Sequence, residues 1–147
     1  MLVAVIALGA TASAATKMNG TKGPDRIVGT SGADRIYGRA GNDDLRGGPG
    51  NDRLYGGPGN DLPLAGDAGR DVLIGGPGAD TMLGGAGNDR FDARGGPGDI
   101  VLGGDGRDRI RAVDGARDTI GCGKDRDRVY ADPVDIVARD CERVSRG

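Results

Sequence analysis

Apolar side chains recur along most of this chain at a spacing of about nine residues, and each lies two residues after an aspartate. The three residues that follow each aspartate are enough for a short strand that turns one side chain inward. Glycines two residues before the aspartates suit turns that need positive φ or a close approach of the backbone. The predicted inward side chains are Ile27, Ile36, Leu45, Leu54, Leu73, Met82, Phe91, Val101, Ile110, Ile120 and Val129.

The aspartates keep the same register, in steps of nine residues that are interrupted by three steps of ten. The unit with the fullest pattern is Gly-Gly-Pro-Gly-Asn-Asp-Arg-Leu-Tyr at residues 47–55. The fifth unit departs from it, because Pro63 takes the apolar position. The longer steps indicate one-residue insertions near Ala65, Ala93 and Val113, which either preserve the stack as loops or divide it.

A turn followed by a short strand, repeated in this way, predicts an all-β fold: a parallel β-roll (β-solenoid) of about twelve nonapeptide half-coils. Two repeats make one coil, so alternate aspartates are expected to stack along opposite edges of the roll. Stacked strands lie about 4.8 Å apart, and two carboxylates at that distance repel by about 1 kcal/mol even in water. Ca²⁺ between them would offset the repulsion, since it accepts six to eight oxygen ligands, main-chain carbonyls included, in irregular geometry. The pattern therefore predicts several Ca²⁺ ions.

This unit resembles the haemolysin-type, or RTX, calcium-binding repeat, whose nonapeptide reads Gly-Gly-x-Gly-x-Asp-x-apolar-x. The resemblance covers about residues 20–130 and is strongest over 47–92. It implies a secreted calcium-ion-binding protein whose repeats hold Ca²⁺ between successive turns and act as a structural or interaction module. Carried over position by position, it implies these carboxylate ligands: Asp25, Asp34, Asp43, Asp52, Asp61, Asp71, Asp80, Asp89, Asp99 and Asp108.

Beyond these ten, the repeat becomes degenerate. Asp118 and Asp127 are expected to be weaker sites or none, because Ala116 and Asp125 replace the glycine of the turn. Residues 118–147 lose glycine and gain apolar alternation, which predicts a degenerate repeat and cap over the last open edge of the roll. A separate ligand site at the aspartates of this segment is disfavoured, since the ligand spacing of an EF-hand is not met.

The two cysteines, Cys122 and Cys141, both lie in this segment. In an exported protein such a pair predicts a disulfide, which would contribute roughly 3 kcal/mol by closing a loop of about 20 residues. Two buried free thiols are the alternative. Two cysteines and no histidine do not complete a zinc site of the usual type.

An apolar run at the N-terminus, followed by Ala12-Ser13-Ala14, predicts a signal peptide at residues 1–14 and hence a secreted, extracellular protein. A buried N-terminal strand or helix is the alternative. The run is too short to cross a bilayer, which needs about 20 apolar residues. Residues 15–19 would form a linker to the β-roll of residues 20–117.

Composition narrows the function further. The chain has 31 glycines and only 3% aromatic residues, so a conventional core of bulky side chains is excluded. The net charge of −2 and the lack of a basic block or stacking aromatics predict no nucleic-acid partner. Without histidine the chain lacks the usual acid–base and triad chemistry, and we expect no enzyme. Two alternatives remain open: a glycan- or surface-recognition solenoid with outward Arg35, Arg53 and Arg90, or a repeat remnant of a larger exported hydrolase or adhesin.

Overall fold

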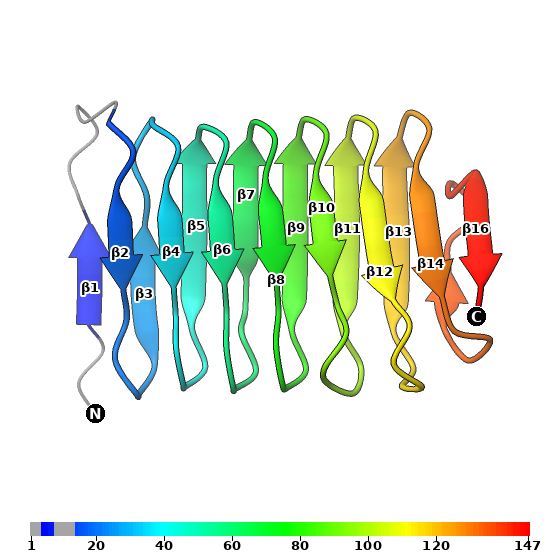
Figure 1. The fold of residues 1–147 in the computed structure, drawn as a ribbon, viewed down its shortest axis with the longest axis horizontal. Helices are drawn as coiled ribbons and strands as arrows, with labels where there is room; N and C mark the ends of the chain where they lie inside the picture. Colours follow the sequence, from blue (N-terminus) through cyan, green and yellow to red (C-terminus); the bar gives the residue numbers. More distant parts are fainter. Residues whose placement is uncertain (1–3, 8–13) are drawn as a thin grey trace.

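The computed structural model describes the backbone of residues 4–7 and all of residues 14–147, and it confirms the parallel β-roll. Sixteen strands form two parallel sheets of eight strands each, which face one another across a single file of apolar side chains. Figure 1 shows the strands of the two sheets alternating along the roll, with tight turns above and below.

The odd-numbered strands form sheet A, and the chain crosses to sheet B after each of them. Sheet A contains β1 (Ala4–Ala7), β3 (Asp25–Val28), β5 (Asp44–Pro49), β7 (Leu64–Ala68), β9 (Thr81–Ala86), β11 (Ile100–Asp105), β13 (Thr119–Lys124) and β15 (Ile136–Val137). Sheet B contains β2 (Lys17–Asn19), β4 (Arg35–Tyr37), β6 (Arg53–Tyr55), β8 (Val72–Ile74), β10 (Arg90–Asp92), β12 (Arg109–Ala112), β14 (Arg128–Ala131) and β16 (Arg143–Arg146).

Each of the strands β2 to β14 contributes an inward side chain to the core, as the nine-residue spacing predicts. All eleven predicted apolar residues are buried, with at most 2% of each side chain exposed. Parallel pairing keeps them in register, for example Ile36 with Leu54 and Leu54 with Leu73. Each residue therefore packs on its equivalents one coil away, and a strand of three residues is long enough to take part.

The three one-residue insertions are absorbed in the connections between strands, and the stack stays continuous. In the fifth unit Leu64, rather than Pro63, is the inward residue, and it pairs with Leu45 on one side and Met82 on the other. Leu62, just before it, is 58% exposed, so the extra residue bulges out ahead of β7. The other two extra residues lie in the turns after β10 and β12, where Ala93 and Ala112 are still buried.

The roll is longer than the twelve half-coils predicted. The twelve aspartate units produce strands β3 to β14, and β1, β2, β15 and β16 extend both sheets at their ends. Within the predicted signal peptide, residues 4–7 pair with β3 as an edge strand, whereas residues 1–3 and 8–13 lie outside the described part of the chain. Cleavage of a signal peptide stays a prediction.

The segment predicted as a disulfide-stapled cap, residues 118–147, carries the disulfide and continues both sheets as β13 to β16. Its strands keep the register of the roll, as Val129 pairs with both Ile110 and Val144. The described residues contain no helix long and apolar enough to cross a membrane.

Candidate metal centre

The turns that connect the two sheets stack into two edges, named here after their place in Figure 1. Turns from sheet B to sheet A form the lower edge, and turns from sheet A to sheet B form the upper edge. Twelve of these turns end in an aspartate that is at most 2% exposed. The lower edge holds Asp25, Asp43, Asp61, Asp80, Asp99 and Asp118, and the upper edge holds Asp34, Asp52, Asp71, Asp89, Asp108 and Asp127.

Hydrogen bonds link the aspartates of each edge into a ladder. The main-chain N–H of each aspartate donates to Oδ1 of the aspartate one coil further on, over 2.7–2.9 Å. Asp135 ends the lower ladder and Glu142 the upper one, by accepting the N–H of Asp118 and of Asp127. In every one of these carboxylates except that of Asp25, one oxygen thereby holds two coils together.

The second oxygen, Oδ2, has a different environment. In the part of the chain that the structure describes, it is buried without any hydrogen-bond partner in ten of these aspartates. A buried polar atom without a partner costs about 1–3 kcal/mol, and more when it carries charge. The ten are Asp43, Asp52, Asp61, Asp71, Asp80, Asp89, Asp99, Asp108, Asp118 and Asp127.

Burial raises the pKa of every one of these ten carboxyl groups. Loss of hydration is the largest cause in each case, and the accepted N–H hydrogen bond acts in the opposite direction. The pKa rises from 3.8 to about 7 for Asp61, Asp71, Asp99 and Asp108. Without a cation, the roll therefore holds columns of carboxylates that resist ionisation near neutral pH.

Seven of the ten unpartnered oxygens belong to turns that begin with glycine, and beside them the missing side chain leaves a hollow. A methyl group on Gly66 would overlap Oδ2 of Asp71 and lie 2.8 Å from the carbonyl oxygen of Gly84, one coil further on. A methyl group on Gly47 would likewise overlap Oδ2 of Asp52. A carboxylate oxygen and a main-chain carbonyl oxygen thus face the same space, and these are the ligands that Ca²⁺ prefers. The residues fit calcium.

The sequence model of the RTX calcium-binding nonapeptide repeat matches residues 19–53, 40–62 and 65–98, which is more than half of the chain. The chain belongs to this RTX family. No curated protein matches the chain at a significant level. The structure carries the repeat beyond the matched residues, since the ladder continues to Asp118 and Asp127.

Most RTX turns of this chain have six residues, with positive φ at the second and fourth positions. In the turn of residues 47–52 these are Gly48 and Gly50, with φ of 92° and 152°. A methyl group on Gly48 would also lie 2.6 Å from the carbonyl oxygen of Thr30 in the preceding coil, so side chains are excluded by contact as well as by conformation. Three other residues adopt positive φ at equivalent positions, namely Arg39, Asp67 and Asp125.

The first RTX turn of each edge satisfies its aspartate with threonine. The N–H of Thr30 donates to Oδ2 of Asp34 over 2.6 Å, and the Thr30 hydroxyl donates to the same oxygen over 2.9 Å. On the lower edge Thr21 donates to Asp25 through the same two groups. The sequence predicted Asp25 and Asp34 as equivalent to the other eight ligands, but their carboxylates already have protein partners. The sequence feature that distinguishes these two turns is the threonine at the second turn position, where later units mostly have glycine.

The distal turns of the lower edge differ in another way. The turns that lead to Asp99 and Asp118 have seven residues, and they begin with Ala93 and Ala112 in place of glycine. Ala112 pairs with Ala131 of the next coil, so the register between β12 and β14 is maintained at this position. These two turns therefore carry a methyl group at the position that is glycine in seven of the ten turns with an unpartnered oxygen. The upper-edge turn of Asp127 keeps six residues, with positive φ at Gly123 and Asp125, but it too begins without glycine, at Cys122.

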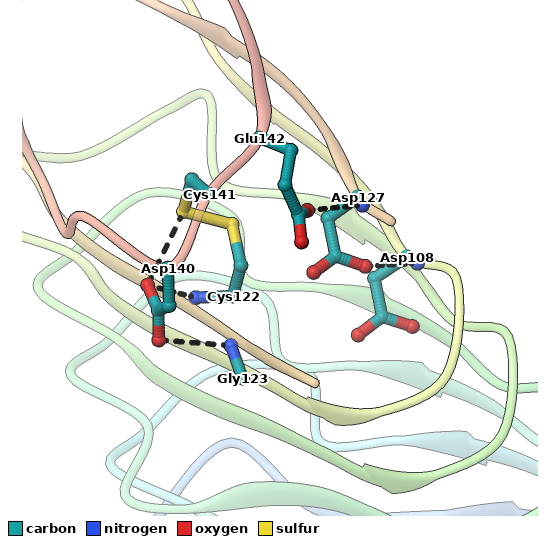
Figure 2. The surroundings of a disulfide bond; sticks show 7 residues. All are labelled: Asp108, Cys122, Gly123, Asp127, Asp140, Cys141 and Glu142. Atoms are coloured by element: carbon teal, nitrogen blue, oxygen red, sulfur yellow. Dashed lines mark hydrogen bonds between the residues drawn. A yellow bond between two sulfur atoms is a disulfide. The ribbon is translucent and has the colours of Figure 1, made fainter. Parts of the chain in front are cut away.

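The predicted disulfide between Cys122 and Cys141 is confirmed, with Cα atoms 5.1 Å apart. Figure 2 shows Asp140 beside it, accepting the N–H groups of Cys122 and Gly123. These two cysteines and Asp140 are also the one cluster of three potential metal ligands among the described residues. Because the disulfide uses both sulfur atoms, this cluster is a covalent staple and is not a candidate metal site.

Proposed function

We propose that this RTX protein is an exported structural or interaction module that completes its fold by binding Ca²⁺ between successive turns. One observation carries the proposal: ten buried carboxylate oxygens in two stacked columns have no hydrogen-bond partner among the described residues. A divalent cation supplies the missing partner and offsets the repulsion within each column, whereas an apo roll must protonate these groups or stay incompletely folded.

The sites are expected to differ in strength. The strongest would lie in six-residue turns that begin with glycine, where the hollow beside Oδ2 is open. Asp25 and Asp34 would contribute least, since threonine already donates to their Oδ2 atoms. Asp99 and Asp118 would be weaker than Asp89 and Asp108 of the upper edge, because their turns begin with Ala93 and Ala112 rather than with glycine.

Metal-dependent folding suits export. A chain that cannot fold until it meets Ca²⁺ stays extended in a compartment poor in calcium and becomes rigid outside. The disulfide between Cys122 and Cys141 supports an oxidising destination. The RTX repeat is itself a structural calcium-binding unit, and the chain has no histidine, so we propose no catalytic role.

The test is a calcium titration of residues 15–147, followed by circular dichroism and by isothermal titration calorimetry. We expect β-structure to be largely absent in excess chelator at neutral pH and to appear cooperatively as calcium is added, with several ions bound per chain. A magnesium titration is the matched control, since Mg²⁺ demands stricter octahedral geometry and keeps its water. Full β-structure in chelator, unchanged by calcium, would refute the proposal.

A further inference from the structure

Basic side chains form a straight row along the outward face of sheet B. They occupy the first position of each strand, and parallel pairing places each directly beside the next. Val72 is the one break, paired with Arg53 on one side and Arg90 on the other. We name this set the basic row: Lys17, Arg35, Arg53, Arg90, Arg109, Arg128 and Arg143.

The charges of the basic row are not neutralised by the protein. All seven side chains are exposed, and none takes part in an ion pair within the described chain, where the paired bases are Arg26, Arg46, Arg94 and Lys124. Neighbouring strands lie about 4.8 Å apart, and like charges directly opposite on paired strands are destabilising. A chain of net charge −2 thus gathers unpaired positive charge into one line.

Two hollows flank the distal half of the basic row. One, of about 420 Å³, runs along the upper side, where turn residues Arg70, Arg107 and Arg126 add to the arginines of the row. The other, of about 800 Å³, lies on the opposite side of the row and includes the apolar surfaces of Ile74 and Tyr130. Arg90, Arg109 and Arg128 line both hollows, so the two join into one surface along the row. We name this surface the trough; it is cationic along one side and partly apolar along the other.

We propose that this trough binds a linear acidic polysaccharide, laid along the axis of the roll, with an anionic group on each sugar. An extended polysaccharide is straight and repeats its charge about once per sugar ring, close to the strand spacing that separates the arginines. Guanidinium groups bind carboxylate and sulfate through two parallel N–H donors. The C–H faces of the sugar rings would pack on Ile74 and Tyr130.

A single-stranded nucleic acid fits the trough less well. Proteins that bind single strands combine basic grooves with aromatic side chains on which successive bases stack. None of the ten described residues that line the upper hollow is aromatic, and Tyr130 is the one exposed aromatic residue that lines the other. The trough offers regular charge without base-stacking platforms, which favours the glycan.

This inference needs the folded roll and so rests on the proposed function for its geometry, but the two can fail separately. Asp89 and Asp108 lie beneath the upper hollow, and calcium bound at their turns would make the trough more positive. If calcium-loaded protein folds but does not bind the glycan, only the present inference fails. If calcium does not fold the chain, the proposed function fails first.

The test measures binding of three polysaccharides to the calcium-loaded chain by isothermal titration at low ionic strength. Chondroitin sulfate carries on average one anionic group per sugar, hyaluronate one per two sugars, and dextran none. We expect affinity to fall in that order and to weaken as salt is added. The variant with Arg90→Gln, Arg109→Gln and Arg128→Gln should bind chondroitin sulfate about tenfold more weakly. Val72→Arg, which closes the gap in the row, should strengthen binding about threefold.

The matched control removes the same charge elsewhere: Arg26→Gln, Arg46→Gln and Arg139→Gln lie outside the trough and should leave affinity within about twofold. Calcium stoichiometry and circular dichroism of each variant establish that the roll is intact, and Val72→Arg keeps the test decisive if the triple variant misfolds. Absence of chondroitin sulfate binding, or an equal loss in the control, would overturn the proposal. Tighter binding of single-stranded oligothymidylate, lost in the same triple variant, would reassign the trough to nucleic acid.

Discussion

The upper and lower edges of the roll carry the same ladder of aspartates but differ in how regular their turns are. On the upper edge, six-residue turns follow one another from Gly29 to Asp127. On the lower edge, all three inserted residues accumulate: one after Asp61, and one each in the turns after β10 and β12. The strands between the edges keep their register throughout.

This difference separates what the fold requires from what a metal site requires. The strand register depends on the inward apolar residue and on the ladder bond to Oδ1, and both survive an extra residue in the turn, since Asp99 still accepts from Asp80. The proposed calcium site also uses the hollow beside Oδ2, which is present where the first turn position is glycine. Insertions on the lower edge therefore preserve the solenoid while they degrade its proposed sites.

The largest expected effect is a reversal of pH dependence by calcium. In chelator, the folded-state pKa values of about 6–7 lie above the ordinary value of 3.8, so the folded chain binds more protons than the unfolded chain between these limits. Stability from this source is complete below about pH 4 and is lost as pH rises through about 7. With excess calcium, the ion competes with protons for the carboxylates, so stability rises with pH instead of falling.

Circular dichroism melts at pH 5 and pH 8, with and without calcium, check this prediction. The apo roll should be more ordered at pH 5, and the calcium-loaded roll more stable at pH 8. The same ordering with pH in both conditions would contradict the assignment of the unpartnered oxygens as ligands.

The next effect compares one carboxylate from each edge. Asp71→Asn keeps an acceptor for the N–H of Asp52 but removes charge from a glycine turn of the upper edge, and we expect it to lower the free energy of unfolding in calcium by about 3 kcal/mol. The matched variant Asp99→Asn lies in a seven-residue turn and should cost less and leave calcium stoichiometry closer to that of the parent. In chelator both variants should be stabilising, because each removes a buried charge. Denaturant melts and calorimetry measure these effects, and equal losses in calcium would mean that the edges are equivalent.

A smaller effect comes from exchanging the residues that begin the turns. A methyl group at Gly84 would lie 2.5 Å from Oδ2 of Asp89 and 2.8 Å from Cζ of Phe91, so Gly84→Ala should lower stability in calcium by about 2 kcal/mol and weaken calcium binding. The reciprocal change, Ala93→Gly, opens the hollow on the lower edge and should strengthen calcium binding there. Calorimetric titration of both variants tests whether the hollow contributes to calcium binding. If Ala93→Gly leaves calcium affinity unchanged, the hollow does not contribute.

The smallest effect concerns the threonine turn that opens the upper edge. Thr30→Val keeps the N–H that donates to Asp34 but loses the hydroxyl donor, at a cost of about 1 kcal/mol. Calcium stoichiometry should not change, since this turn is satisfied by the protein. Thr81→Val, on a strand of sheet A, is the matched control and should be close to neutral. A loss of a bound ion in Thr30→Val would show that the threonine turn is itself a calcium site.

Much of the architecture could be predicted from the sequence because it repeats locally. The apolar residue two positions after each aspartate, the glycine turns and the alternation of Asp25 and Asp34 between edges all follow from a nine-residue unit that is half a coil. The disulfide was predictable from the cysteine pair and the expected compartment. The repeated features are set within one unit or by the number of residues between equivalent positions of successive units.

The tertiary structure decided everything that depends on contact between coils. It selected Leu64 rather than Pro63 for the core, because a residue faces inward only if it stacks on Leu45 and Met82. It distinguished Asp34, whose Oδ2 is already hydrogen-bonded, from Asp71, whose Oδ2 is not. The repeat specifies which side chains enter the turns, but their partners come from 18 or 19 residues away, so only the stacked roll establishes which carboxylates still need a cation.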